Sequence, residues 1–180
     1  MSRWIVALLL TLGLAGPAWA ADPANLQVFT DASREVRNYA FFTIFDSVHA
    51  SVDAGVVTLT GKVTMPYKAS DIEQRVARVA GVRQVVNNLQ VLPVSPYDDR
   101  LRISIARAIY ANPALSMYGL GRHPSIHVIV EHGHVTLDGV VSLDEHRQIA
   151  RLVAGSFDGF GPVRNDLRTD EEVQQALQQL

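Results

Sequence analysis

The chain has 180 residues, with 16 basic and 18 acidic side chains and no cysteine. Without cysteine, disulfide bonds and a lipid-modified amino-terminal cysteine are excluded, so core packing alone must hold the fold together. The slight acidic excess argues against nucleic-acid binding and against recruitment to anionic lipid by bulk charge, because both need an excess of basic residues. Local basic patches are still compatible with this composition.

Residues 1–20 are typical of a secretory signal peptide. Arg3 gives a short positive start, residues 4–14 are apolar, and Ala18-Trp19-Ala20 is a cleavage signal. We expect cleavage after Ala20 and export; the alternative is a retained amino-terminal anchor. About 160 residues remain, with a net charge of about −3 once Arg3 is removed. This length suffices for one medium domain or two small ones.

A repeat without gaps organises the rest of the chain. The segment SVHASVDAGVVTLTGKV (residues 47–63) aligns with SIHVIVEHGHVTLDGVV (residues 125–141) at an offset of 78 residues. The same offset relates Asn87 to Asn165. A repeat this long indicates two copies of one folding unit. Two prolines between the copies predict a short extended linker over residues 92–98.

In the first copy the alternation of Val48, Ala50 and Val52 predicts a strand with one buried face. Gly55 supplies the positive φ of a tight hairpin turn. Gly61 falls on the inward face of the second strand, where a missing side chain would let a helix pack close to the sheet. In chain order we expect a helix (31–40), a hairpin (48–63), a helix from Pro66 to Gly81, and a strand (85–91).

The second copy predicts the same order: a helix (98–111), a hairpin (126–141), a helix that begins with a Ser142/Glu145 capping box, and a strand (163–169). The fold class is therefore α+β, with two α-β-β-α-β units, each a three-stranded mixed sheet with two helices on one face. A Thr169/Glu172 capping box and the apolar stripe of Val173, Ala176, Leu177 and Leu180 predict a closing amphipathic helix over residues 170–180.

Copy two carries V-x-V-x-x-G-x-V-x-L-x-G-x-V, and copy one carries the same pattern with Ala50 at the first valine position. In each copy a helix and then a version of G-V-x-x-V-x-N-x-L follow, and the whole resembles the BON domain of bacterial envelope proteins. Copy two departs from the pattern, with Phe160-Gly161-Pro162-Val163 in place of Gly-Val. The resemblance implies BON domains at residues 21–91 and 99–169 in a periplasmic protein that binds phospholipid or supports the envelope under osmotic stress. It implies no catalysis and no cofactor. Its structural signature comprises Gly55, Gly61, Asn87, Gly133, Gly139 and Asn165.

The second hairpin carries His127, His132 and His134, which raises the question of a metal site. A turn at His132-Gly133 places Glu131 opposite His134, and His127 opposite Asp138. Four strand residues put His127 roughly 13 Å from Glu131. One ion cannot span this distance, because zinc–nitrogen bonds are about 2 Å long. We therefore predict no metal site, with an ion shared by the tip residues Glu131, His132 and His134 as the alternative.

His49 and His127 occupy the same position in the two copies. The simplest interpretation is local hydrogen bonding or surface exposure, and the alternative is a shared domain interface or a pH-sensing position. Neither copy has a serine or cysteine nucleophile in a recognisable frame, a glycine-rich phosphate loop or a motif-spaced carboxylate pair. We expect no enzymatic activity and no catalytic residues.

The helix at 100–111 is the main candidate for contact with a membrane or a partner. Its core stripe is accompanied by a second apolar stripe of Ile103, Ala106 and Tyr110, flanked by Arg100 and Arg107. A globular helix needs only one apolar face. The second face could enter a membrane interface with its arginines at the headgroups, or pack on the first copy or on a partner.

Tyr39, Phe41 and Phe42 are weaker contact candidates, because core burial explains these dense aromatic residues better than insertion at a bilayer surface does. The leading hypothesis is a non-enzymatic envelope protein that binds phospholipid surfaces. The alternative is a periplasmic protein-binding or chaperone-like module without lipid contact, and cation binding is a third possibility. The sequence leaves open the lipid headgroup, the partner, the oligomeric state and the orientation of the two domains.

Overall fold

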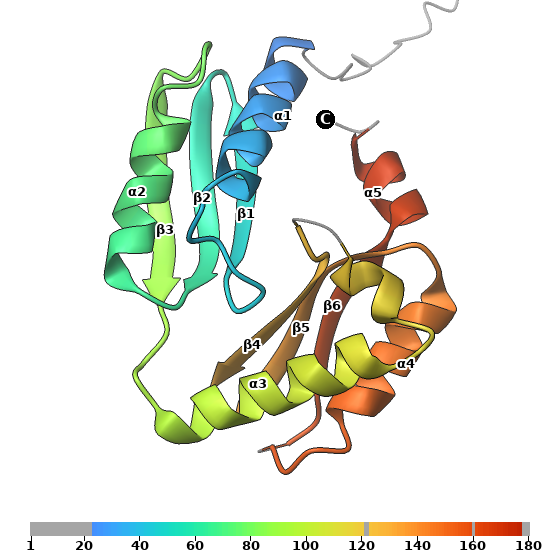
Figure 1. Cartoon of the computed structure of the whole chain (residues 1–180). Helices are drawn as coiled ribbons and strands as arrows, with labels where there is room; N and C mark the ends of the chain where they lie inside the picture. Colours follow the sequence, from blue (N-terminus) through green and yellow to red (C-terminus); the bar gives the residue numbers. More distant parts are fainter. Residues whose placement is uncertain (1–22, 121–122, 160, 178–180) are drawn as a thin grey trace, which may run out of the picture.

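The computed structural model describes residues 23–120, 123–159 and 161–177. The predicted signal peptide and Leu180 lie outside these residues. Two units follow each other along the chain (Figure 1). The first comprises α1 (Pro23–Arg37), β1 (Ser47–Asp53), β2 (Val56–Val63), α2 (Pro66–Val76) and β3 (Gln84–Val91). The second comprises α3 (Pro96–Ala111), the 3₁₀ helix η1 (Ser116–Gly119), β4 (Ile126–Glu131), β5 (His134–Val141), α4 (Asp144–Ala154) and β6 (Arg164–Thr169), and α5 (Asp170–Leu177) follows it.

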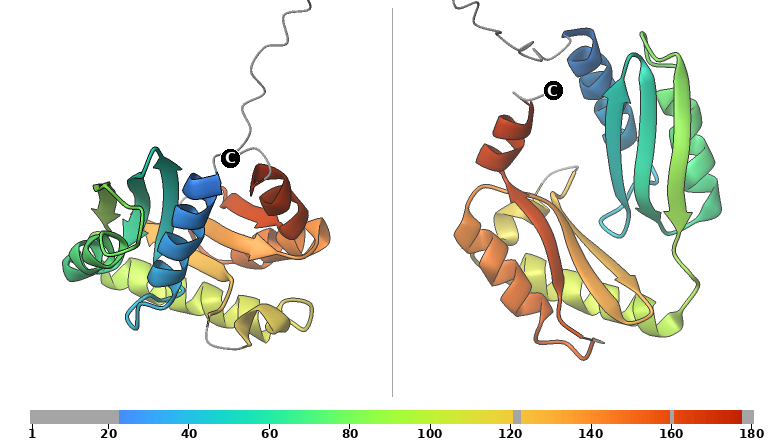
Figure 2. Two further views of the ribbon diagram at one scale, coloured as in Figure 1. Left: turned by 90° about the horizontal axis from the view of Figure 1, so that it is seen from above. Right: turned by 180° about the vertical axis from the view of Figure 1, so that it is seen from behind.

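Each unit contains one mixed three-stranded sheet. The central strand β2 pairs antiparallel with β1 and parallel with β3, and β5 pairs in the same way with β4 and β6. Two helices cover one face of each sheet (Figures 1 and 2). Val57, Leu59 and Val63 alternate along β2 and are fully buried against these helices, together with Ile72 and Val76 of α2. The predicted fold class is confirmed, and each unit has its own core.

Both hairpin turns have the predicted geometry. Ala54 and Gly55 have φ values of 46° and 78°, and His132 and Gly133 have 51° and 77°. Two successive positive φ angles are characteristic of the two-residue turns that match strand twist. The predicted register also holds, since Glu131 pairs with His134 and His127 with Asp138.

The hairpins need glycine at positions 61 and 139, but not for the close helix packing that the sequence indicated. Both have φ near +122°, and a Cβ atom would lie 2.2 Å from the carbonyl oxygen of Ser47 at Gly61, and 1.9 Å from that of Ser125 at Gly139. The neighbouring strand, and not a helix, occupies the space that a side chain would need.

The repeated asparagines connect the last strand of each unit to its second helix. The Nδ2 atom of Asn87 donates to the carbonyl oxygen of Ala69 at 3.1 Å, and that of Asn165 donates to the carbonyl oxygen of Arg147 at 3.0 Å. The two acceptors are related by the same offset as the two asparagines, so the repeat preserves a contact as well as a pattern.

Several helix ends differ from the prediction. Helix α1 spans Pro23–Arg37 instead of 31–40, and α3 begins at Pro96, so the linker is shorter than 92–98. The Ser142/Glu145 capping box is wrong, because the N-cap residue of α4 is Leu143 and it makes no side-chain cap. The Thr169/Glu172 capping box of α5 is confirmed by reciprocal hydrogen bonds of 2.8 and 3.2 Å.

Candidate functional site: the joint between the two units

Polar side chains from the outer face of the first sheet meet acidic side chains from the outer face of the second. The Nε2 atom of His49 lies 3.0 Å from Oδ2 of Asp138, and the Ser47 hydroxyl donates to the same carboxylate oxygen. Lys62, opposite Ser47 in the first hairpin, forms an ion pair with Glu131. We call these five residues the inter-unit joint. Its carboxylates come from the second unit and its donors from the first.

The environment of the joint keeps Asp138 ionised. Burial by itself would raise the pKa of this carboxyl group, but hydrogen bonds from His49 and Ser47 outweigh it and lower the pKa to about 2. In return, the hydrogen bond to Asp138 raises the pKa of His49 above its ordinary value. Each charge therefore stabilises the other across the joint.

His127 lies beside the joint in a different environment. Its ring centroid is 5.3 Å from that of Phe42 in the first unit, and its buried Nδ1 atom has no hydrogen-bond partner within the described part of the chain. Burial lowers the pKa of His127. The structure thus places both repeated histidines at a shared domain interface. His49 is favoured there as the cation, and His127 as the neutral ring.

We expect His49→Gln and His127→Gln to change the pH dependence of stability in opposite directions. The contribution of His49 is fully present below its unfolded pKa of about 6.5 and is lost as the pH rises through its higher folded pKa. The contribution of neutral His127 is present above about 6.5 and is lost as the pH falls through its lower folded pKa.

Urea unfolding at about pH 5 and about pH 8 measures both effects. Relative to the parent protein, His49→Gln should cost more stability at the lower pH, and His127→Gln should cost more at the higher pH. Slopes of the same sign in both variants would contradict this assignment. The effect of His49 is expected to be the smaller, because its side chain is 48% exposed.

A groove of about 1020 Å³ opens beside the joint. Helix α1 contributes Phe29 and Val36 to its lining, and α5 contributes Val173, Ala176 and Leu177. Figure 1 shows these two helices opposite each other. The predicted apolar stripe of α5 therefore lines a groove that the first unit shares.

The segment before β1 crosses from the first unit to the second. The backbone N–H of Val128 in β4 donates to the carbonyl oxygen of Ile44 at 2.8 Å. Asp46, which is fully buried, accepts hydrogen bonds from the backbone and side chains of Thr43 and Thr64, and from Nζ of Lys68 at 2.7 Å. A buried ion pair in the first unit thus fixes the segment that contacts the second.

The predicted contact stripe on α3 is only partly exposed. Arg100, Ile103 and Arg107 are exposed, but Ala106 is buried in the core of the second unit, so its prediction as a contact residue is wrong. Tyr110 is half-buried and donates its hydroxyl hydrogen to the carbonyl oxygen of Ile126, and burial raises its pKa to about 12.

Sequence reasoning missed two buried charged residues of α3. The carboxylate of Asp98 accepts hydrogen bonds from the backbone N–H groups of His132 (2.9 Å) and Gly133 (2.8 Å) at the hairpin tip. Arg102 donates to the carbonyl oxygen of Val130. Both residues fall outside the repeat, and their charge predicts exposure. Asp98 lies three residues before the core residue Leu101, and Arg102 lies three residues before the core residue Ile105, and this spacing was the available signal.

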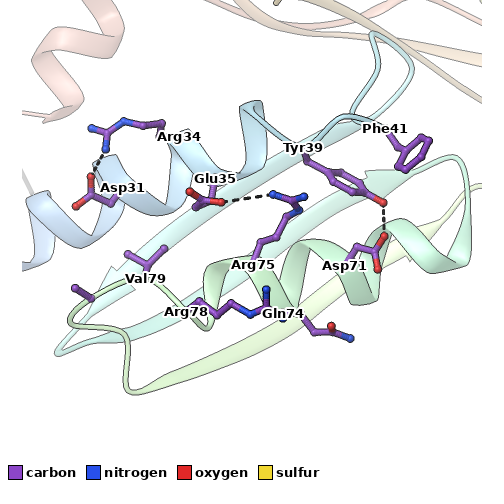
Figure 3. Close-up of a pocket in the computed structure, with 11 residues that line it drawn as sticks. Asp31, Arg34, Glu35, Tyr39, Phe41, Asp71, Gln74, Arg75, Arg78 and Val79 are labelled. Atoms are coloured by element: carbon purple, nitrogen blue, oxygen red, sulfur yellow. Dashed lines mark hydrogen bonds and ion pairs between the residues drawn. The ribbon is translucent and has the colours of Figure 1, made fainter.

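The three aromatic candidates have different environments. Tyr39 is buried, its hydroxyl donates to Asp71 at 2.5 Å, and Arg75 lies over its ring, so its prediction as a surface contact is wrong. Figure 3 shows these residues at a charged pocket of about 750 Å³ between α1 and α2. Phe41 is 57% exposed and packs edge-on against Tyr67, whereas Phe42 is half-buried against His127.

Two further observations concern chemistry and membrane insertion. In the described part of the chain, no three histidine, aspartate or glutamate side chains are grouped so that they could hold a metal ion. None of the described helices is both long and apolar enough to cross a membrane.

The two α-β-β-α-β units and their polar joint define an α+β protein built from a tandem repeat. The BON domain family model matches residues 43–93 and 98–171, which is more than half of the chain, so the protein belongs to the BON domain family. Comparison with curated proteins gave no match.

Two similar solved structures are of CdsD, described as a structural protein of the type III secretion system of Chlamydia trachomatis. One is 16% identical, with a TM-score of 0.34, and the alignment covers 83% of this chain and 64% of that one. The other, of the C-terminal domain, is 15% identical, with a TM-score of 0.33 and coverage of 82% and 66%. The chain therefore spans less than two thirds of either structure.

Proposed function

We propose that this is an exported, non-enzymatic protein of the periplasm that binds phospholipid surfaces through its second unit and supports envelope integrity under osmotic stress. Membership of the BON domain family supports the envelope assignment. The observation that carries lipid binding is the exposed stripe of Arg100, Ile103 and Arg107 on α3. Residues three and four apart share one face of a helix, so these side chains point in a common direction.

The chemistry of this stripe suits a shallow membrane contact. Ile103 would enter the boundary between headgroups and acyl chains, and the flanking arginines would contact lipid phosphates. A basic residue near an anionic surface contributes about 1 kcal/mol. Two arginines and one isoleucine give weak binding, which should fall as the salt concentration rises.

Sedimentation with anionic phosphatidylglycerol vesicles at low salt tests this proposal. We expect Arg107→Glu to weaken binding by about tenfold, because it replaces an attraction with a repulsion. Arg78→Glu, the same charge change on an exposed residue of the first unit, is the matched control and should leave binding close to that of the parent. Equal binding by the Arg107→Glu variant and the control would refute a role for α3.

A second exposed apolar cluster in the same unit offers an alternative lipid contact. Met117, Leu120 and Leu143 are 53%, 76% and 53% exposed. The hydroxyl of Tyr118 accepts a hydrogen bond from the backbone N–H of Ser142, so the residue after Met117 contacts the residue before Leu143. If Leu120→Ser reduces vesicle binding and Ile103→Ser does not, the contact lies at this cluster instead of on α3.

The inter-unit groove favours a second function, a protein-binding module that acts without lipid. Its apolar lining comes from both units, and it is large enough to receive a peptide. A stable partner in a periplasmic pull-down, or suppression of client aggregation in the absence of lipid, would support this function. Failure of both would leave lipid binding as the only proposal.

A further inference from the structure

Helix α5 has an apolar face that its own unit leaves uncovered. The helix has eight residues, Asp170–Leu177, and none of these eight is buried. Isolated helices shorter than about 12 residues are marginal in water, so a short helix depends on tertiary packing of its apolar face. That face carries Val173 and Leu177, which are half-buried, and Ala176, which is exposed. We therefore looked for a second apolar surface against which α5 could pack.

The first turn of α5 is anchored, whereas the rest of the helix is not. Among the described residues, the polar contacts that join α5 to the second unit are the capping box of Thr169 and Glu172 and two hydrogen bonds from Arg147 to Glu172, at 2.9 and 3.1 Å. Farther along, Gln175 donates to Glu171 within the helix itself. Because hinges commonly lie at the ends of elements, α5 can pivot about its first turn.

Helix α1 presents a suitable face on the other side of the inter-unit groove. Phe29, Thr30 and Ser33 line the groove at helical spacing, and none of the three is buried. Arg37, in the last turn of α1, belongs to the same lining. The two helices run in opposite directions, so that α5 begins toward the end at which α1 finishes (Figures 1 and 2).

The charges at these two helix ends are complementary. Arg37 is the last residue of α1, and Asp170 is the first residue of α5. The two acids of the groove lining already have partners, since Asp138 belongs to the inter-unit joint and Asp166 pairs with Arg164 at 2.7 Å. An antiparallel arrangement also brings the positive end of the α5 dipole toward the negative end of the α1 dipole.

We propose that α5 is a lid that closes on α1 over the inter-unit groove. The helix pivots about its first turn, its apolar face packs against Phe29 and Ser33, and Asp170 pairs with Arg37. Closure is favoured because it removes from water apolar side chains that both helices now leave partly exposed. The closed lid covers the outer face of β1, including His49, and excludes a partner from the groove.

Disulfide trapping tests closure, because the chain has no cysteine of its own. Thr30 and Ala176 are exposed and line the groove from α1 and α5. A disulfide requires Cα atoms within about 7 Å. Under mild oxidation, the protein with Thr30→Cys and Ala176→Cys should form an intramolecular disulfide about tenfold faster than the protein with Thr30→Cys and Gln175→Cys. Gln175 is the matched control, since it lies on the opposite face of α5. Equal rates would overturn the proposal.

Charge reversal tests the predicted ion pair in the same trapping experiment. Asp170→Lys or Arg37→Glu alone should slow trapping about threefold, and the two together should restore the rate, because the attraction is re-formed with opposite signs. Glu171→Lys makes the same charge change in the same turn but on the face away from α1, so it should leave the rate unchanged. Failure of the double reversal to restore the rate would reject the contact between the start of α5 and the end of α1.

Chemical modification of histidine tests whether closure covers the groove. His49 lines the groove, and His132 is exposed but lies outside its lining. In the disulfide-locked protein, carbethoxylation of His49 should be several-fold slower than after reduction, and that of His132 should not change. Peptide mass spectrometry measures both rates. Equal modification of His49 in the locked and reduced proteins would show that α5 is not a lid.

Two further results separate this proposal from its alternatives. If oxidation of the Thr30→Cys and Ala176→Cys protein links two chains instead of closing one, α5 docks on a second copy and the proposal of a lid fails. The inference does not depend on lipid binding, since Arg107→Glu should reduce vesicle binding and leave disulfide trapping unchanged.

Discussion

Alanine at Gly139 or at Gly61 is expected to destabilise its unit by about 3 kcal/mol or more. Both positions have φ near +122°, a region that residues with a side chain rarely adopt. The added methyl group would also lie only 1.9 Å from the carbonyl oxygen of Ser125, or 2.2 Å from that of Ser47. Because both obstacles are backbone atoms of the paired strand, relief requires the two strands to separate.

Gly155→Ala is the matched control for these substitutions. Gly155 has an ordinary φ of −71°, and its nearest neighbour would be 3.2 Å from an added Cβ atom. Alanine there should change stability by less than about 1 kcal/mol, because no unusual backbone angle is required. Urea unfolding followed by circular dichroism measures all three variants. A Gly139→Ala protein as stable as the Gly155→Ala protein would show that the hairpin tolerates a side chain there.

These glycines show how far the sequence could predict the fold. The repeat identified both hairpins, their turns and the inward face on which Gly61 and Gly139 lie. Periodicity reports which face a residue occupies, but not how closely the neighbouring backbone approaches. The helix-packing explanation was therefore wrong although the positions were correct.

The same reasoning explains the errors on α3. Helical periodicity placed Ala106 and Tyr110 on a second apolar face of α3. The residues that follow α3 fold back onto this face, since a Cβ atom at Gly119 would lie 2.6 Å from the ring of Tyr110. A helix pattern contains no information about a later segment that covers it. Of the predicted contact residues on α3, Arg100, Ile103 and Arg107 are left exposed.

The joint could be predicted only in part. The recurrence of His49 and His127 suggested a shared interface as one alternative, and the structure places both there. The position of Asp138 opposite His127 in its own hairpin was predicted, but the contact of Asp138 with His49 depends on how the two sheets meet. No spacing along the chain encodes this arrangement.

The buried ion pair of Asp46 and Lys68 was hidden by the repeat itself. The equivalent positions in the second unit hold Pro124 and His146, so comparison of the copies gave no signal for a charged pair. Lys68 does lie four residues before Ile72, on the core stripe of its helix. A cation at that position implies a buried partner, and this was the available signal.

Replacing Asp46 with alanine is expected to lower the free energy of unfolding by about 3–5 kcal/mol, because it leaves the Lys68 ammonium buried without a counter-charge. The backbone N–H groups of Thr43 and Thr64 would also lose their acceptor. Asp31→Ala is the matched control, since Asp31 pairs with the exposed Arg34. It should cost less than about 1 kcal/mol. Urea unfolding at neutral pH compares the two variants.

The pH dependence provides an independent test of Asp46. Burial alone would raise its pKa, but the hydrogen bonds from Lys68, Thr64 and Thr43 outweigh burial and lower it below 3.8. The stabilising contribution of Asp46 is therefore complete above about pH 4 and is lost as the pH falls through its folded pKa. Asp46→Ala should consequently lose less stability than the parent between neutral and acid pH. An acid slope equal to that of the parent would contradict an ionised Asp46.

The consequences of Asp46→Ala should extend beyond the first unit. Asp46 holds Thr43 on one side of Ile44, and Ile44 accepts the edge hydrogen bond from Val128. Without this anchor, residues 43–46 should leave the edge of β4 more often, and the amide of Val128 should exchange faster than in the Asp31→Ala control. An unchanged exchange rate at the Val128 amide would show that the segment docks on β4 without help from Asp46.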